Sequence, residues 1–439
     1  MHEQKHNLNP NKMKRILLIL IVLIISHIGI GQTLLYRTAV IHTNPTTLRG
    51  GTCRSWTANS VISYYQEQDT HYFAVVYENS TTMDAIKFVN GNYSIYDFCV
   101  LGDSIYLCGT KGGKGVVGCI NINDITSSVP LPRIEEKSFD SLVSVNKLVA
   151  YYQPGNRYAH VAAIGERRYY ANPHTRLRSY MIDVCFGPGP FGYSARVQSY
   201  VDQDDTSQIE RLYDVVATKN YIAFVGIITN SSSLTIRKCD KSGIFSTNTY
   251  ETIFQYRLPY YGVPYAVALK DDKIATASEC TIINQVENAT HVRLFDLPTM
   301  TMYAAQSMSS PYKSFINDLT YMPYDNTLLL VHVDQNGSYP DHRVVYFKLS
   351  ATPPYNTYAI TTADKRNLSS ITLHNSRFFI VSDGEKIMSH YKPWVHPSNT
   401  CINIDTREIQ DLDLIPYDKI QYTGHQNQSE RHHTCPQKS

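Results

Sequence analysis

The chain has 439 residues, a formal net charge of +2 and only 18% charged residues. The charges nearly balance, and the chain has no basic run. We therefore expect neither a nucleic-acid partner nor binding to an anionic membrane surface. Tyrosine is abundant (34 residues) and tryptophan is scarce (2 residues), while amphipathic helical patterns are hard to find. Because tyrosine and β-branched residues favour strands, the composition predicts an all-β protein.

The first residues contain H-E-x-x-H, the pattern of zinc proteases, at His2, Glu3 and His6. This pattern binds zinc only on a helix inside a folded domain that supplies a further ligand. Here a turn-forming run with Pro10 follows at once. We therefore expect no zinc protease, and the sequence indicates no metal and no cofactor.

Residues 1–31 are organised like a secretory signal peptide. A positive segment around Lys14 precedes an apolar run of about ten residues, and small residues precede the expected cleavage before Gln32. The run is too short for a comfortable membrane span, so we expect no stable span; a retained N-terminal anchor is the alternative. Met13 is a more usual start for such a signal, which leaves translation of residues 1–12 open. The expected location is secreted, periplasmic or at the cell surface.

A strand–turn–strand unit repeats along most of the remaining chain. Each unit has a polar turn of the kind found in hairpins, a third strand follows, and a fourth is plausible in most units. The position of Asp97 recurs at 140, 214, 266, 318 and 370, and the last four of these positions are 52 residues apart. The units begin at Asn59, Tyr96, Phe139, Tyr213, Tyr265, Asn317 and Ser369.

A four-stranded unit that recurs every ~40–50 residues resembles the blades of the β-propeller superfamily. Stacking the blades in a ring buries both faces of each sheet. The sequence predicts a β-propeller of about seven four-stranded blades, with six or eight as alternatives and paired β-sandwiches as the competing fold. The blades lack the motifs of WD40, kelch and sialidase repeats, and in style they are similar to secreted propellers of Bacteroidetes-type bacteria.

The propeller domain is expected to span residues 32–423, with an insertion at about 166–211 and a disordered tail at 424–439. We expect residues 33–43 to close the ring by pairing with the final blade, whose last strand is predicted at 401–406.

Three local patterns are interpreted as structural. The glycine-rich run 109–118 has the wrong spacing for a phosphate-binding loop and is expected to be a hairpin tip. The acidic run 202–210 lacks the glycine and the bidentate glutamate of a calcium loop. Cys99 and Cys108 flank a predicted turn, and whether they pair depends on the strand register. The chain also contains no G-x-S-x-G nucleophile motif.

The candidate binding residues are the repeated aspartates and two tyrosines that precede them. In a propeller the first strands line the axial channel, where several carboxylates could bind a ligand or act as acid and base. The alternative is structural, because a repeated aspartate often accepts backbone N–H bonds between blades. The candidates are Asp97, Asp140, Asp214, Asp318, Tyr96 and Tyr213.

These observations predict an exported, non-catalytic propeller that acts as a binding or scaffold module for a glycan or protein partner. No catalytic residue is assigned. The alternative is a glycan-active hydrolase or lyase with carboxylates at the axial channel. The sequence leaves the oligomeric state open.

Overall fold

The computed structural model describes residues 36–420 apart from short gaps. The expected signal peptide and tail, and most of the 202–210 run, lie outside the described residues. The gaps are 41–47, 58–59, 68–69, 78–82, 90–92, 127–133, 156, 172–173, 188–194, 200–209, 229–232, 242–252, 258–262, 282–287, 311, 325, 337–338, 350–356, 363–367, 375–376, 383–385, 392–401, 408 and 412–418.

The described strands form seven antiparallel sheets. The first sheet contains β2 (Leu48–Thr57), β3 (Ser60–Glu67), β4 (Thr70–Tyr77) and β5 (Met83–Val89). The second contains β6 (Tyr93–Leu101), β7 (Ser104–Lys111), β8 (Lys114–Asn121) and β9 (Glu135–Phe139). The third contains β10 (Ser144–Tyr152), β11 (Ala159–Ala171), β12 (His174–Phe186) and β13 (Ala195–Ser199).

The next three sheets each have a fifth strand from the C-terminal part of the chain. The fourth contains β14 (Glu210–Ala217), β15 (Tyr221–Ile228), β16 (Ser233–Asp240), β17 (Ile253–Arg257) and β31 (Lys419–Ile420). The fifth contains β18 (Pro264–Ala268), β19 (Lys273–Thr281), β20 (Asn288–Asp296), β21 (Thr301–Ser310) and β30 (Ile409–Asp411). The sixth contains β22 (Ser314–Met322), β23 (Thr327–Asn336), β24 (Tyr339–Lys348), β25 (Thr357–Thr362) and β29 (Ile402–Arg407).

The seventh sheet joins the two ends of the ring. It contains β26 (Leu368–His374), β27 (Arg377–Ser382), β28 (Lys386–Tyr391) and β1 (Tyr36–Val40). The predicted closure by residues 33–43 is confirmed, since β1 pairs with β28. The placement of 401–406 was wrong: β29 pairs with β25 in the sixth sheet, because β1 already occupies the outer edge of the seventh.

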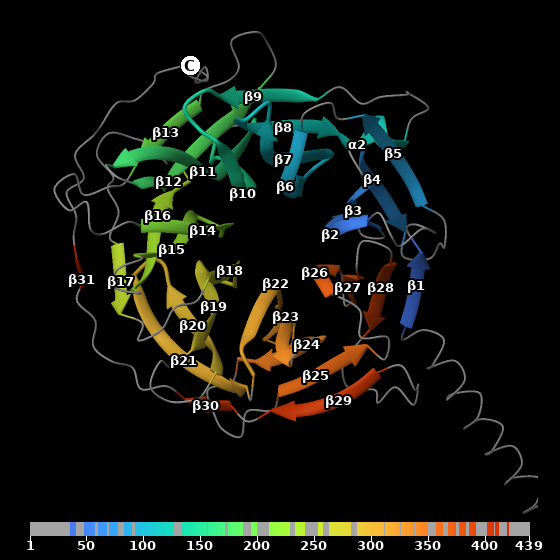
Figure 1. Ribbon diagram of the computed structural model, residues 1–439, viewed down its shortest axis with the longest axis vertical. Helices are drawn as coiled ribbons and strands as arrows, with labels where there is room; N and C mark the ends of the chain where they lie inside the picture. The colour runs from blue at the N-terminus through green and yellow to red at the C-terminus, as the bar shows by residue number, and fades with distance from the viewer. Residues whose placement is uncertain are drawn as a thin grey trace, which may run out of the picture.

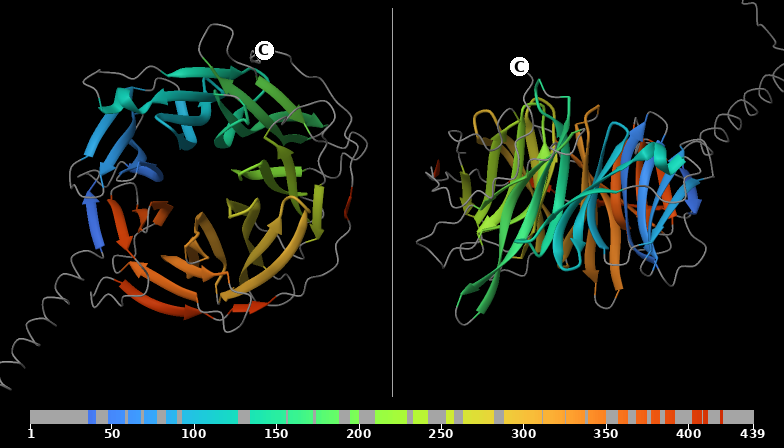
Figure 2. Two further views of the ribbon diagram at one scale, coloured as in Figure 1. Left: turned by 180° about the vertical axis from the view of Figure 1, so that it is seen from behind. Right: turned by 90° about the horizontal axis from the view of Figure 1, so that it is seen from above.

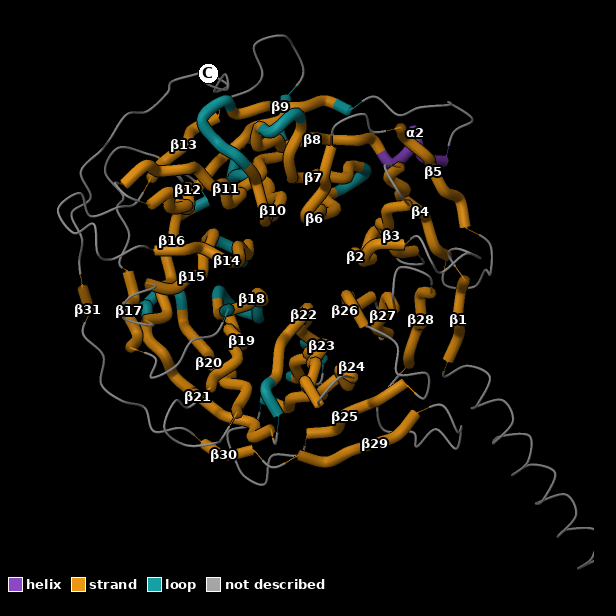
Figure 3. The backbone as a smooth tube through the Cα atoms, viewed as in Figure 1, coloured by secondary structure: helices purple, strands orange, loops and turns teal. Residues whose placement is uncertain are grey.

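The sheets stand around a central axis, as Figure 1 shows, so the predicted β-propeller fold is confirmed. Their innermost strands are β2, β6, β10, β14, β18, β22 and β26 (Figures 1 and 3). Only two of the predicted units are displaced. The unit predicted from Asn59 is β3–β4, one strand further out than expected, and residues 144–152 within the unit from Phe139 form a single strand.

The core lies between neighbouring sheets. Phe73 of the first sheet and Phe98 of the second are almost fully buried, with their ring centroids 5.4 Å apart in an edge-to-face arrangement. Similar clusters join the fifth and sixth sheets, where Ala275 and Leu328 belong to one buried group. Neighbouring sheets from the first to the sixth thus bury apolar side chains against each other, which is the physical reason for stacking them in a ring.

A group of hydrogen bonds to one carboxylate also joins the fourth and fifth sheets. Asp272, in the turn before β19, accepts hydrogen bonds from the Thr218 hydroxyl (2.7 Å) and from the Asn220 backbone (2.8 Å) and side-chain amide (2.5 Å). Both donors lie in the turn between β14 and β15. The turns between the first and second strands of these two sheets therefore contact each other.

The glycine-rich run 109–118 is the hairpin that the sequence predicts. It forms the β7–β8 turn, where Gly112 and Gly113 have positive φ. Cys99 lies opposite Tyr106 in the β6–β7 register, not opposite Cys108, and both cysteines are free thiols. The only helix in the described part of the chain, α2 (Ile122–Thr126), has five residues, and no described helix is long and apolar enough to cross a membrane.

The region predicted as an insertion contains the longest strands. β11 and β12 have 13 residues each and pair along their whole length, from Ala159–Phe186 to Ala171–His174. Figure 2, in its right-hand view, shows this green hairpin projecting beyond the other strands on one side of the ring. It extends the third sheet away from the ring.

Candidate axial site

The axial site is built by irregularities in the innermost strands. In five of them the register shifts at a similar point, so that one residue is left without a cross-strand partner. Such a β-bulge bends the strand and re-aims the side chains beside it. The residues immediately after the shift are Asp97, Lys147, Asp214, Asp318 and Ser370.

Three of the four predicted aspartates occupy this position, and Asp140 does not. Asp140 follows the outer strand β9, its side chain is 86% exposed, and it pairs with Lys114 at 2.7 Å. Lys147 holds the equivalent axial position in the third sheet. The sequence alignment was wrong here because it treated the bulge at Asn146 as a hairpin turn.

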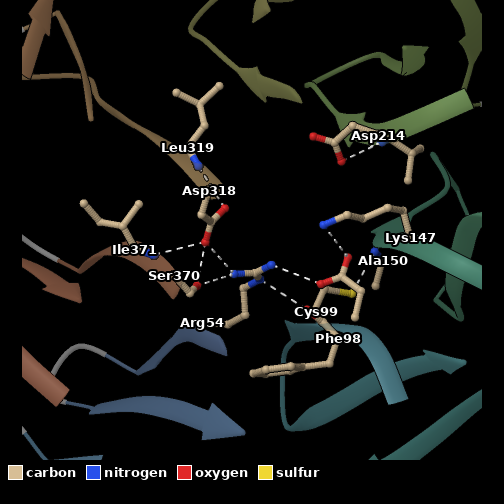
Figure 4. Close-up of polar contacts among 12 residues, drawn as sticks. Arg54, Phe98, Cys99, Lys147, Ala150, Asp214, Asp318, Leu319, Ser370 and Ile371 are labelled. Carbon is tan, nitrogen blue, oxygen red and sulfur yellow. Dashed lines mark hydrogen bonds and ion pairs between the residues drawn. The ribbon is translucent and has the colours of Figure 1, made fainter. Parts of the chain in front are cut away.

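Arg54, from β2, connects its own sheet with three others at the axis (Figure 4). Its guanidinium donates to Asp97 at 3.1 Å, to the Phe98 carbonyl at 3.2 Å and to Asp318 at 3.5 Å. It also lies 3.4 Å from the Ser370 hydroxyl. Its planar, multi-donor head suits this role, since it reaches acceptors in several directions at once.

Asp318 links the sixth sheet to the seventh. One carboxylate oxygen accepts the backbone N–H of Leu319 in its own strand at 2.9 Å. The other accepts the backbone N–H of Ile371 at 3.0 Å and the Ser370 hydroxyl at 2.5 Å, both on β26. The carboxylate therefore satisfies a backbone donor of the neighbouring sheet, as the structural alternative anticipates.

Asp214 repeats this pattern between the fourth and fifth sheets. Its oxygens accept the backbone N–H groups of Val215 (2.9 Å) and of Ala266 on β18 (2.8 Å). Burial raises the pKa of Asp214 to about 6, against the opposing effects of Lys147 and of the bond from Ala266. Among the described residues, no ion pair of Asp214 is as close as the one between Arg54 and Asp97 at 3.1 Å.

Lys147 is the second cation of the axis. Its ammonium lies 3.8 Å from Asp97, and its side chain is 29% exposed. The charge of Asp97 raises the pKa of Lys147 above its ordinary value, against the opposing effect of burial, and Asp214 and Asp318 also favour the charged form. Among the described residues, two cations (Arg54 and Lys147) and three carboxylates (Asp97, Asp214 and Asp318) thus lie around the axis.

Tyr96 and Tyr213 are the bulged residues themselves. Tyr96 lies between the paired residues Ile95 and Asp97, and half of its side chain is exposed. Tyr213 has the same place in β14 and is half-buried. Both tyrosines therefore lie directly beside the predicted aspartates. Arg54 and Lys147 also belong to the axial site, and the sequence did not indicate them.

A further carboxyl group, Glu279 on β19, joins the fifth and sixth sheets. It accepts the backbone N–H of Ile316, on β22, at 2.8 Å. Burial raises its pKa to about 7, against the opposing effects of that hydrogen bond and of Lys313.

Replacing Glu279 with glutamine is expected to flatten the dependence of stability on pH. With a folded pKa near 7, Glu279 binds a proton more readily in the folded than in the unfolded state. Its contribution to stability therefore falls as the pH rises from the unfolded pKa towards 7, and E279Q removes that fall. Urea unfolding of both proteins between pH 4.5 and pH 8 measures the slope. If the free energies of unfolding of the two proteins change with pH in parallel, Glu279 does not titrate in this pH range.

Comparison with protein-family models finds no match, and comparison with curated proteins finds none either. Solved structures similar to this chain include virginiamycin B lyase from Staphylococcus aureus (9% identity, TM-score 0.46, 81% of this chain and 99% of that one). They also include BamB from Moraxella catarrhalis (11%, 0.40, 80% and 99%) and prolyl oligopeptidase B from Galerina marginata (8%, 0.48, 84% and 52%). At these identities the likenesses assign no activity to this chain.

Proposed function

We propose that this protein is a non-catalytic β-propeller, exported from the cytoplasm, that acts as a binding or scaffold module for a glycan or protein partner. The observation that carries the proposal is the use of the axial carboxylates. Asp214 and Asp318 each accept a backbone N–H from the next sheet, and Asp97 pairs with Arg54 and Lys147. These three carboxylates therefore already make hydrogen bonds or ion pairs that link one sheet to another. The predicted signal peptide supports export.

A glycan-active hydrolase or lyase is the second candidate, and one observation favours it. A carboxyl group with a pKa of about 6, as at Asp214, has a value suited to a general acid at neutral pH. However, both of its oxygens already accept backbone N–H groups. Proton transfer to a substrate would compete with the bond between the fourth and fifth sheets, so we rank the enzyme second.

The decisive experiment uses purified residues 32–439 with neutral and acidic polysaccharides. It scores retention on each polymer and the release of new chain ends, for the wild-type protein and for D214N. We expect no new ends with either protein. Release by the wild-type protein that disappears in a folded D214N variant would replace the binding proposal with the enzyme. Retention of none of the polymers would direct the search to a protein partner by pull-down.

A further inference from the structure

Lys147 is an ammonium group at the axis that makes no hydrogen bond within the described part of the chain. Its ion pair with Asp97 measures 3.8 Å, which is longer than a hydrogen bond. An ammonium carries three N–H donors and no acceptor. The side chain is 29% exposed, so solvent reaches it and a ligand can replace that solvent. Lys147 therefore offers donors that the bonds between the sheets do not use.

Asp214 supplies acceptors on the neighbouring sheet. Figure 4 shows the side chains of Lys147 and Asp214 projecting toward the axis from the third and fourth sheets. Burial raises the pKa of Asp214 to about 6 and Lys147 opposes that rise, so the two groups lie within electrostatic reach of each other. Each oxygen of Asp214 accepts one backbone N–H, from Val215 or from Ala266, and a carboxylate has about four acceptor positions. Acceptor positions therefore remain for a ligand.

The ligand that fits this pair is neutral and bears hydroxyl groups. Both signs of charge surround the axis, so the carboxylates repel an added anion, and Arg54 and Lys147 repel an added cation. A hydroxyl group both donates and accepts, so it can accept from an ammonium and donate to a carboxylate at once. Two hydroxyls on neighbouring carbon atoms can satisfy both protein groups, and sugars carry this arrangement.

Exposed aromatic surface beside the same groups also favours a sugar. Tyr96 directly precedes Asp97 and is 50% exposed to solvent. Tyr213 directly precedes Asp214 and is half-buried. A tyrosine offers a flat apolar ring with a polar hydroxyl group, which suits the apolar side of a pyranose and the water around it. The axis therefore combines donors, acceptors and aromatic surface.

We propose that Lys147 and Asp214 bind a neutral sugar residue at the axis, with the ammonium donating to one hydroxyl oxygen and the carboxylate accepting from a neighbouring hydroxyl. The bonds from Val215 and Ala266 to Asp214 stay in place in this arrangement. This inference rests on the proposed function and narrows its partner to a neutral glycan.

The test titrates residues 32–439 with glucose, galactose and mannose at millimolar concentrations and follows binding by saturation-transfer NMR. The wild-type protein should bind at least one of these sugars. K147M should bind it about tenfold more weakly, because it removes a charge-assisted hydrogen bond and keeps a side chain of similar length. The matched control K114M removes a lysine that pairs with exposed Asp140 on the second sheet, away from the axis, and should bind like the wild-type protein.

Thermal unfolding without sugar separates lost binding from lost folding, because K147M also removes the ion pair with Asp97. The independent variant D214N should weaken sugar binding as well, and all affinities are compared at a temperature where each variant is folded. Unchanged affinity of either folded variant would overturn the inference, and so would a wild-type protein that binds none of the three sugars. Retention of a polysaccharide that K147M leaves unchanged, or capture of a protein partner without sugar binding, would keep the proposed function and remove only this inference.

Discussion

Replacing Arg54 with alanine is expected to lower the free energy of unfolding by about 3 kcal/mol. The guanidinium pairs with Asp97 at 3.1 Å and Asp318 at 3.5 Å and also donates to the Phe98 carbonyl. Its removal leaves one nearly buried and one partly buried carboxylate without this partner, in a region shared by three sheets. The cost of an uncompensated charge there is larger than that of an exposed ion pair.

Urea unfolding at pH 7 measures this loss, with R157A as the control, because Arg157 is exposed and stacks on Tyr158 in a turn. R54K separates charge from geometry. It should recover only part of the stability, since an ammonium cannot reproduce the several directed donors of the guanidinium. Equal stability of R54A and the wild-type protein would show that the axial network contributes little to holding the ring.

Replacing Gly109 with alanine is expected to destabilise the second sheet by about 3 kcal/mol or more. A Cβ atom at this position would lie 1.8 Å from the carbonyl oxygen of Ser94, which is backbone and cannot rotate away. Gly109 pairs with Ile95, the last residue before the bulge that presents Asp97. The glycine therefore lets the bulged strand lie close to its neighbour, and a methyl group would push the two strands apart.

Thermal and urea unfolding test this prediction, with G112N as the matched control. Gly112 has φ of 57° and nothing within 4 Å of an added Cβ, and asparagine tolerates that conformation. A second variant, G226A, should behave like G109A, since its Cβ would lie 2.3 Å from the carbonyl oxygen of Arg211. Wild-type stability in both alanine variants would mean that the bulges adapt without cost.

The repeat made most of the fold predictable from sequence, because alternating strands and polar turns are local signals. Asp97, Asp214 and Asp318 were located because their units align without ambiguity around the first hairpin. Asp140 was misplaced for a local reason. A bulge interrupts the two-residue alternation of a strand, and a bulged Asn146 has the same chemistry as a turn residue.

The residues that pair with the axial aspartates could not be predicted from the sequence, for a different reason. Arg54 stands 264 positions from Asp318 and 316 from Ser370, and no local pattern relates them. It belongs to the unit whose alignment was displaced by one strand.

The pairing of β1 with β28 sets the order of events during biosynthesis. Its partners, such as Tyr36 and His390, are about 350 residues apart in the chain. β1, the first described strand of the chain, must therefore wait for β28 to be made before it can pair, and until then its edges are open. A nascent chain that stops before β28 cannot form the β1–β28 pair. The ring can therefore close only after synthesis has passed residue 391.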